Sequence, residues 1–153
     1  MLTTDVSGVT IQSDGTQWWI VGAINGTTPP TAVQGVASAS FNENSDIYID
    51  EPVAGPSALA VVPASGQLIV ILTAEISTNR QNSTGFMSVS LNNSVALDAN
   101  SLRVTGPNPV RSSITVAITG LTPGVSITFS AVYKVIGGGS ATFNARQIIV
   151  IPN

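Results

Sequence analysis

The chain has 153 residues, of which 43% are hydrophobic and only 8% are charged, against roughly 25% charged residues in an ordinary soluble domain. Its net charge of −3, with five basic residues, leaves no basic face for binding nucleic acid. The absence of cysteine and histidine excludes disulfides, thiolate zinc sites and the commonest general base.

Short strands separated by turn residues are predicted in the first part of the chain. Residues 9–11 and 16–21 flank a loop that ends in Gly15, a pattern typical of a β-hairpin. After a polar linker, alternation predicts further strands at 33–41, 46–50 and 58–62. Gly35 interrupts the first of these, where a bulge or close packing is expected.

The longest strands are predicted in the second part of the chain. Residues 67–77 are apolar on both faces at their N-terminal end, as expected for a strand that is covered on both sides. Shorter strands follow at 85–91 and 102–104. The stretch 111–151 predicts three strands joined by the turns GLTPG and GGG, and we expect these strands to pair as a meander.

This organisation predicts an all-β fold. About nine or ten short strands at regular spacing, without helical periodicity, are typical of an antiparallel β-sandwich, here of the jelly-roll type. We expect residues 1–45 to form a short N-terminal β-hairpin and anchoring segment, and residues 46–153 to form the sandwich. The N-terminus lacks a basic region followed by an apolar one, so we expect synthesis in the cytoplasm. Apolar runs such as 68–72 are too short to span a membrane.

Five residues are candidates for a contact between subunits. Trp18 and Trp19 are adjacent in a predicted strand, so their side chains point to opposite faces and only one can fill a core. The other is expected at a subunit or partner contact, with glycan stacking or packing within the chain as alternatives. The final strand is apolar on both faces, so Ile148 and Val150 lie in the centre of a sandwich or contact another subunit. Arg146 is then expected to form an ion pair or hydrogen-bond fork near that contact.

Acidic residues offer weaker candidates. Asp46, Asp50 and Glu51 could surround a cation, but the pattern DIYID has no Gly-rich loop, and a solvated strand edge is predicted instead. Without histidine or cysteine, no Ser-His-Asp or Cys-His arrangement is possible. No pair of carboxylates is singled out for glycoside hydrolysis. We predict that the chain is not an enzyme and has no catalytic residues, cofactor or metal.

Four stretches together resemble a known family: GPSALAVVPASGQLIVILTAEIS, TGFMSVSLNNSVALDANSLRV, SSITVAITGLTPGVSITFSAVYKV and SATFNARQIIVIPN. They are similar to a β-sandwich module of tailed phages of actinobacteria, in proteins labelled minor tail or virion structural proteins. The resemblance covers roughly residues 46–153. A second resemblance, of ITGLTPGVSITFSAVYKV to the end of a fibronectin type III domain, has Ile127 where that family's tyrosine usually stands.

The phage resemblance implies a structural role in a virion, often with trimeric assembly through jelly-roll domains, and supplies no catalytic residues. The expected partners are further copies of the chain as a homotrimer, other virion proteins and a glycan of the host wall, with no nucleic acid or membrane. The first expectation is a minor tail or tail-tip protein. The alternatives are a capsid decoration protein on the phage head and a free carbohydrate-binding module.

Overall fold

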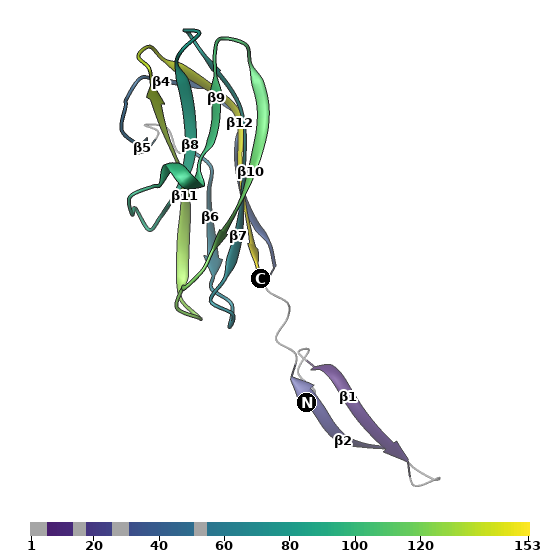
Figure 1. The fold of residues 1–153 in the computed structure, drawn as a ribbon. Coiled ribbons are helices and arrows are strands. Elements are labelled where there is room, and N and C mark those ends of the chain that lie inside the picture. The colour runs from purple at the N-terminus through teal and green to yellow at the C-terminus, as the bar shows by residue number, and fades with distance from the viewer. Residues whose placement is uncertain (1–5, 14–17, 26–30, 51–54) are drawn as a thin grey trace. The chain divides into compact units, whose positions relative to one another are not determined.

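A computed structural model describes residues 6–13, 18–25, 31–50 and 55–153, the first two ranges as backbone only (Figure 1). The chain divides into two compact units, Met1–Thr31 and Ala32–Asn153. The sequence pattern placed this boundary after residue 45. It lies earlier because β3 (Val33–Ala37) and β4 (Phe41–Glu43) pair with the last strand of the sandwich.

The first unit is an antiparallel hairpin of β1 (Val6–Ser13) and β2 (Trp18–Asn25). Its ladder runs from Val6 opposite Asn25 to Ser13 opposite Trp18, with two irregularities in register. The predicted N-terminal hairpin is therefore confirmed.

The second unit consists of two antiparallel sheets. The β7–β12 sheet has the order β10-β7-β12-β3, with β4 also paired to β12, and the β8–β11 sheet has the order β5-β11-β8-β9, with β6 also paired to β11. The remaining elements are β5 (Ile49–Asp50), β6 (Ser57–Val61), β7 (Leu68–Thr78), β8 (Thr84–Leu91), the 3-10 helix η1 (Asp98–Asn100), β9 (Leu102–Thr105), β10 (Val110–Ile118), β11 (Ser126–Ile136) and β12 (Ala141–Pro152).

The connections between the sheets are those of a jelly roll. If β3 with β4 and β5 with β6 are taken as two interrupted strands, every connection except that from β8 to β9 passes from one sheet to the other. The predicted all-β sandwich is confirmed. The predicted meander of residues 111–151 is wrong, because β11 leaves the sheet that holds β10 and β12. The same crossing argues against a fibronectin-like domain, whose last two strands lie in one sheet.

The core lies between the inner faces of the two sheets. The inward side chains of β7 are fully buried: Leu68, Val70, Leu72, Ala74 and Ile76. At one end of this core, Phe41, Tyr133 and Phe143 form an aromatic cluster with ring centroids 4.6 to 5.3 Å apart. Of the helices among residues 31–50 and 55–153, none is long and apolar enough to cross a membrane.

A β-bulge interrupts β12. Asn144 lies opposite Glu75 and Gln147 lies opposite Thr73, so that two residues of β12, Ala145 and Arg146, span the single position of Ala74. Ala145 has a φ of 45°, in the left-handed region. The inward positions therefore change from odd numbers before the bulge to even numbers after it, and Arg146 faces the core.

Candidate functional site

Three of the predicted interface residues lie inside the sandwich. Ile148 and Val150 have no exposed surface, and Arg146 is 1% exposed. All three point from β12 into the core of their own chain, so the prediction that they contact another subunit is wrong. Of the two placements that the sequence left open for Ile148 and Val150, the central position in a sandwich is the correct one, because β12 lies between β7 and β3.

Arg146 forms its predicted hydrogen-bond fork within the chain. Its Nη1 donates to the Tyr133 hydroxyl at 3.3 Å and its Nη2 donates to the Ala39 carbonyl at 2.6 Å. The guanidinium also lies 4.6 Å from the centroid of the Phe41 ring. Ala39 lies in the segment between β3 and β4, so Arg146 connects this segment to the aromatic cluster through its hydrogen bonds. Its role is structural.

Trp18 and Trp19 begin β2, opposite Ser13 and Gln12 of β1. Their side chains lie outside the described residues, and their predicted contact with a partner stays a prediction.

The outer face of the β7–β12 sheet carries four isoleucines, which we call the isoleucine face: Ile69 and Ile71 of β7, and Ile149 and Ile151 of β12. Ile71 lies directly opposite Ile149, and Ile69 lies opposite Ile151, so the four side chains form one block across the two central strands. Each is partly exposed. The opposite sides of β7 and β12 fill the core, so these four side chains belong to the outer surface of the sheet, with Thr115 and Ala117 of β10 and Gln34 of β3 beside them.

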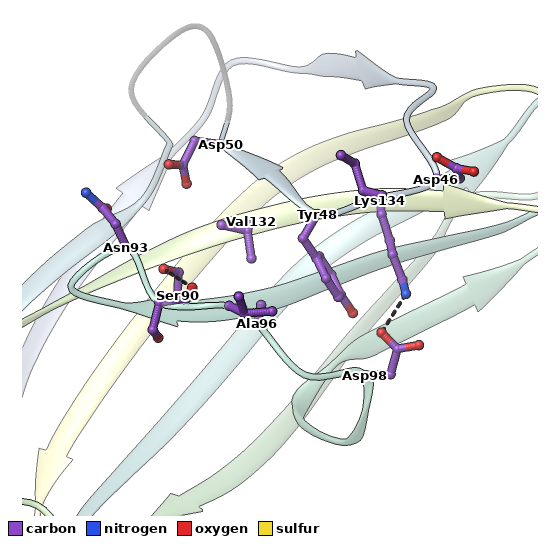
Figure 2. Close-up of a pocket in the computed structure, with 12 residues that line it drawn as sticks. Asp46, Tyr48, Asp50, Ser90, Asn93, Ala96, Asp98, Val132 and Lys134 are labelled. Atoms are coloured by element: carbon purple, nitrogen blue, oxygen red, sulfur yellow. Dashed lines mark hydrogen bonds and ion pairs between the residues drawn. The ribbon is translucent and has the colours of Figure 1, made fainter.

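A second surface feature is a groove on the outer side of the β8–β11 sheet, which we call the Tyr48 groove (Figure 2). Its volume is about 480 Å³. One wall is the segment before and within β5, the other is the loop after β8, and the floor includes β11. The lining residues are Asp46, Ile47, Tyr48, Asp50, Ser90, Asn93, Ser94, Val95, Ala96, Asp98, Val132 and Lys134.

Lys134 is held firmly at one end of the groove. Its Nζ donates to Asp98 Oδ1 at 2.6 Å, and it lies 4.6 Å from the centroid of the Tyr48 ring and 4.9 Å from that of Phe86. The hydrogen bond from Lys134 lowers the pKa of Asp98 below its ordinary value. The positive charge of the ammonium is thus compensated by the ion pair with Asp98 and by cation–π contacts with two rings.

Tyr48 stands between this ion pair and the rest of the groove. Figure 2 shows its ring with Lys134 on one side and Ala96 and Val132 on the other. Its hydroxyl is buried near Ser101, Asp98 and Ser88, but no described residue meets the geometry of a hydrogen bond with it. Burial disfavours the phenolate and raises the pKa of Tyr48 to about 12.

Hydrogen bonds fix the loop wall. The Asn92 amide donates to the Thr128 carbonyl at 2.9 Å, and the Thr128 amide donates to the Asn92 side-chain oxygen at 2.8 Å. Ser90 Oγ donates to the Ser94 carbonyl at 2.9 Å, and Ser88 Oγ donates to the Leu97 carbonyl at 3.1 Å. The groove is consequently formed before any ligand arrives.

The aspartates of the groove do not come together. Within residues 31–50 and 55–153, no three acidic side chains lie close enough to hold a metal ion. Glu51 is outside the described residues. The sequence pattern did place Asp46, Tyr48 and Asp50 on one strand face. It did not indicate the loop 92–98 that faces them, because that contact links segments of the chain with no shared periodicity.

Comparisons with known proteins give distant structural likeness only. No family model matches the chain, and no curated protein does. The carbohydrate-binding module CBM6 at the C-terminus of LamC, a marine laminarinase from Zobellia galactanivorans, is 14% identical, with a TM-score of 0.31 over 74% of this chain and 99% of the module. The arabinose-bound α-L-arabinofuranosidase MgGH51 is 14% identical, with a TM-score of 0.34 over 81% of this chain and 25% of the enzyme. Likeness at this level carries no information on ligand or activity.

Proposed function

We propose that this chain is a non-enzymatic structural component of a tailed-phage virion, a minor tail or tail-tip protein that assembles through the faces of its β-sandwich. The observation that carries the proposal is the isoleucine face. Its four side chains lie on the outer face of a sheet in a chain with only 8% charged residues. The free energy falls when a neighbouring subunit covers such a surface, because apolar area is removed from water.

Two further features support a role in an assembly. The four stretches of sequence described above resemble virion structural proteins, and the sandwich they form is a jelly roll. The polar residues that surround the Tyr48 groove lie on the other sheet, so one face can be buried while the groove stays open to a ligand.

A capsid decoration protein is the second candidate. The separate compact unit Met1–Thr31 favours it, because a small hairpin ahead of the sandwich could brace against a capsid surface. In both roles the chain is made in the host cytoplasm and ends in the virion.

Gold labelling of particles of the encoding phage, with an antibody against the sandwich, tests the proposal. Label at the tail or its tip supports the first role, and label over the head supports decoration instead. Both roles would be overturned if neither labelling nor mass spectrometry detects the protein in intact or in disrupted particles.

A further inference from the structure

We propose that the Tyr48 groove is a binding site for a neutral saccharide unit. The inference goes beyond a structural role, and it does not depend on where in a virion the chain resides.

The size and floor of the groove suit a small ring. Its volume of about 480 Å³ falls within the range of roughly 300–1,000 Å³ that is typical of small-molecule sites. The inner surface of the groove is apolar, formed by Val132 on the floor together with the Tyr48 ring and Ala96 on the two walls. A pyranose has C–H groups on its faces, which pack against surfaces of this kind.

The rim supplies hydrogen-bond acceptors. The carboxylate of Asp50 and the side chain of Asn93 lie near Val132, on two different walls, and Asp46 lies at the other end of the groove, beyond Lys134 (Figure 2). Sugar hydroxyl groups lie around the edge of the ring and donate to carboxylate and amide oxygens. An apolar surface flanked by acceptors from both walls is therefore complementary to a sugar ring with hydroxyl groups at its edge.

The charges of the groove argue against other ligands. Lys134 is bound to Asp98 and covered by two aromatic rings, so it does not attract an anion. Asp46 and Asp50 have no basic residue paired with them among the described residues and repel anionic ligands. A metal ion is not supported, since no three acidic side chains of residues 31–50 and 55–153 converge.

The groove is also preorganised, because hydrogen bonds to Thr128, Ser88 and Ser90 hold the loop wall in place. A preformed wall lowers the entropic cost of binding a weak ligand. We expect a dissociation constant in the millimolar range, as is usual for one small polar unit with few contacts.

Backbone amide NMR of the full chain tests the site, with glucose, galactose, mannose, arabinose and N-acetylglucosamine as separate probes. At least one sugar should produce saturable shifts confined to residues 46–50, 90–98 and 132–134. Asp50→Asn should weaken this binding several-fold, and Ala96→Leu, which fills part of the groove, should weaken it at least tenfold. Glu75→Gln removes the same charge from the other sheet and should leave the affinity unchanged.

Two results would overturn the inference. The first is that none of the five sugars shifts these amides, whether or not lysine amide, as a cationic probe, binds there. The second is that Ala96→Leu and Asp50→Asn bind sugar as the wild type does. Asp50 lies on an exposed strand end, so its variant keeps the test valid if Ala96→Leu fails to fold. A negative result here leaves the particle labelling unaffected, and the two proposals fail separately.

Discussion

Ala145 occupies a backbone conformation that costs an L-amino acid energy. At a φ of 45° its Cβ crowds the neighbouring carbonyl, at a cost of about 1–2 kcal/mol, whereas glycine adopts this region freely. Ala145 nonetheless forms part of the bulge in β12, and this bulge orients Arg146 toward the core.

We expect Ala145→Gly to raise the free energy of unfolding by roughly 0.5–1 kcal/mol, after the greater flexibility of glycine in the unfolded chain is subtracted. Urea denaturation measures the change. The control is Ala117→Gly, the same substitution on an exposed position of β10 with ordinary strand geometry, which should lower stability. Equal losses in the two variants would show that Ala145 is not strained.

Within residues 31–50 and 55–153, Arg146 is among the largest side chains that are fully buried. We expect Arg146→Met to lower the free energy of unfolding by about 3 kcal/mol, since the Ala39 carbonyl and the Tyr133 hydroxyl lose a charged donor in the core. Arg103→Met is the matched control: Arg103 is exposed and stacks on Phe86 at 5.5 Å, and its loss should cost within about 1 kcal/mol. An Arg146→Met variant that is as stable as the wild type would contradict the structural role.

Tyr48 should ionise about two pH units above a free tyrosine, at a pKa of about 12 against 10.0. The folded protein favours the protonated phenol, so the stability that this group contributes is complete below pH 10 and is lost as the pH rises from 10 to 12. Ultraviolet absorbance of tyrosinate, with Tyr48→Phe to assign the signal, measures the titration. Ionisation of Tyr48 near pH 10 would mean that its hydroxyl is open to water.

Between elements, β3 of one sheet passes very close to β6 of the other at Gly35. A Cβ on Gly35 would come within 2.1 Å of the Ser57 carbonyl oxygen. The close packing expected at Gly35 is thus present, in the form of a backbone-to-backbone contact that has no room for a methyl group.

Gly35→Ala should therefore lower the free energy of unfolding by about 1–3 kcal/mol or more, because β3 must move away from β6. Gly120→Ala separates this effect from backbone strain, since Gly120 has a φ of 75° and open space around its Cβ position. Thermal unfolding of both variants gives the comparison. A loss at Gly35 no greater than that at Gly120 would indicate that the sheets separate easily.

At the level of elements, alternation predicts strands well and pairing poorly. The period-2 pattern of β7 and β11 is local, and both strands form where it indicates. The partners of β11 are chosen by the packing of two sheets, which no local pattern encodes, and the expected meander fails for that reason. In β12 the alternation also misleads, because one extra residue at Ala145 changes which numbers face inward.

The same limit applies to the candidate surfaces. Apolar residues on both faces of β12 correctly indicated an outer apolar surface, but the sequence could not tell which of the two sets is outside. Ile148 and Val150 lie inside, and Ile149 and Ile151 belong to the isoleucine face. For the Tyr48 groove, the pattern DIYID indicated one wall. Lys134 and Ala96 join the groove only through contacts between segments that are distant in the sequence.

For the whole molecule, the isoleucine face predicts self-association. We expect light scattering to give a trimer of the 15.6 kDa chain, and we expect Ile149→Lys to shift the mass to a single chain without a large change in melting temperature. Leu59→Lys is the control, because Leu59 is 60% exposed on the other sheet.

If both lysine variants, or neither, dissociate the trimer, association does not run through the isoleucine face. A wild-type mass of one chain would rule out a stable free trimer and leave association on a virion lattice as the remaining form of the proposal.

The bulge in β12 has a consequence for how relatives of this chain should differ from it. Either Asn144 or Ala145 could be removed while Ala141, Phe143, Arg146, Ile148 and Val150 all keep their present side of the sheet. A deletion there would regularise the ladder with β7, whereas a deletion a few positions later would exchange the inner and outer isoleucines. Single-residue deletions in this strand should accordingly be tolerated at the bulge, next to Arg146.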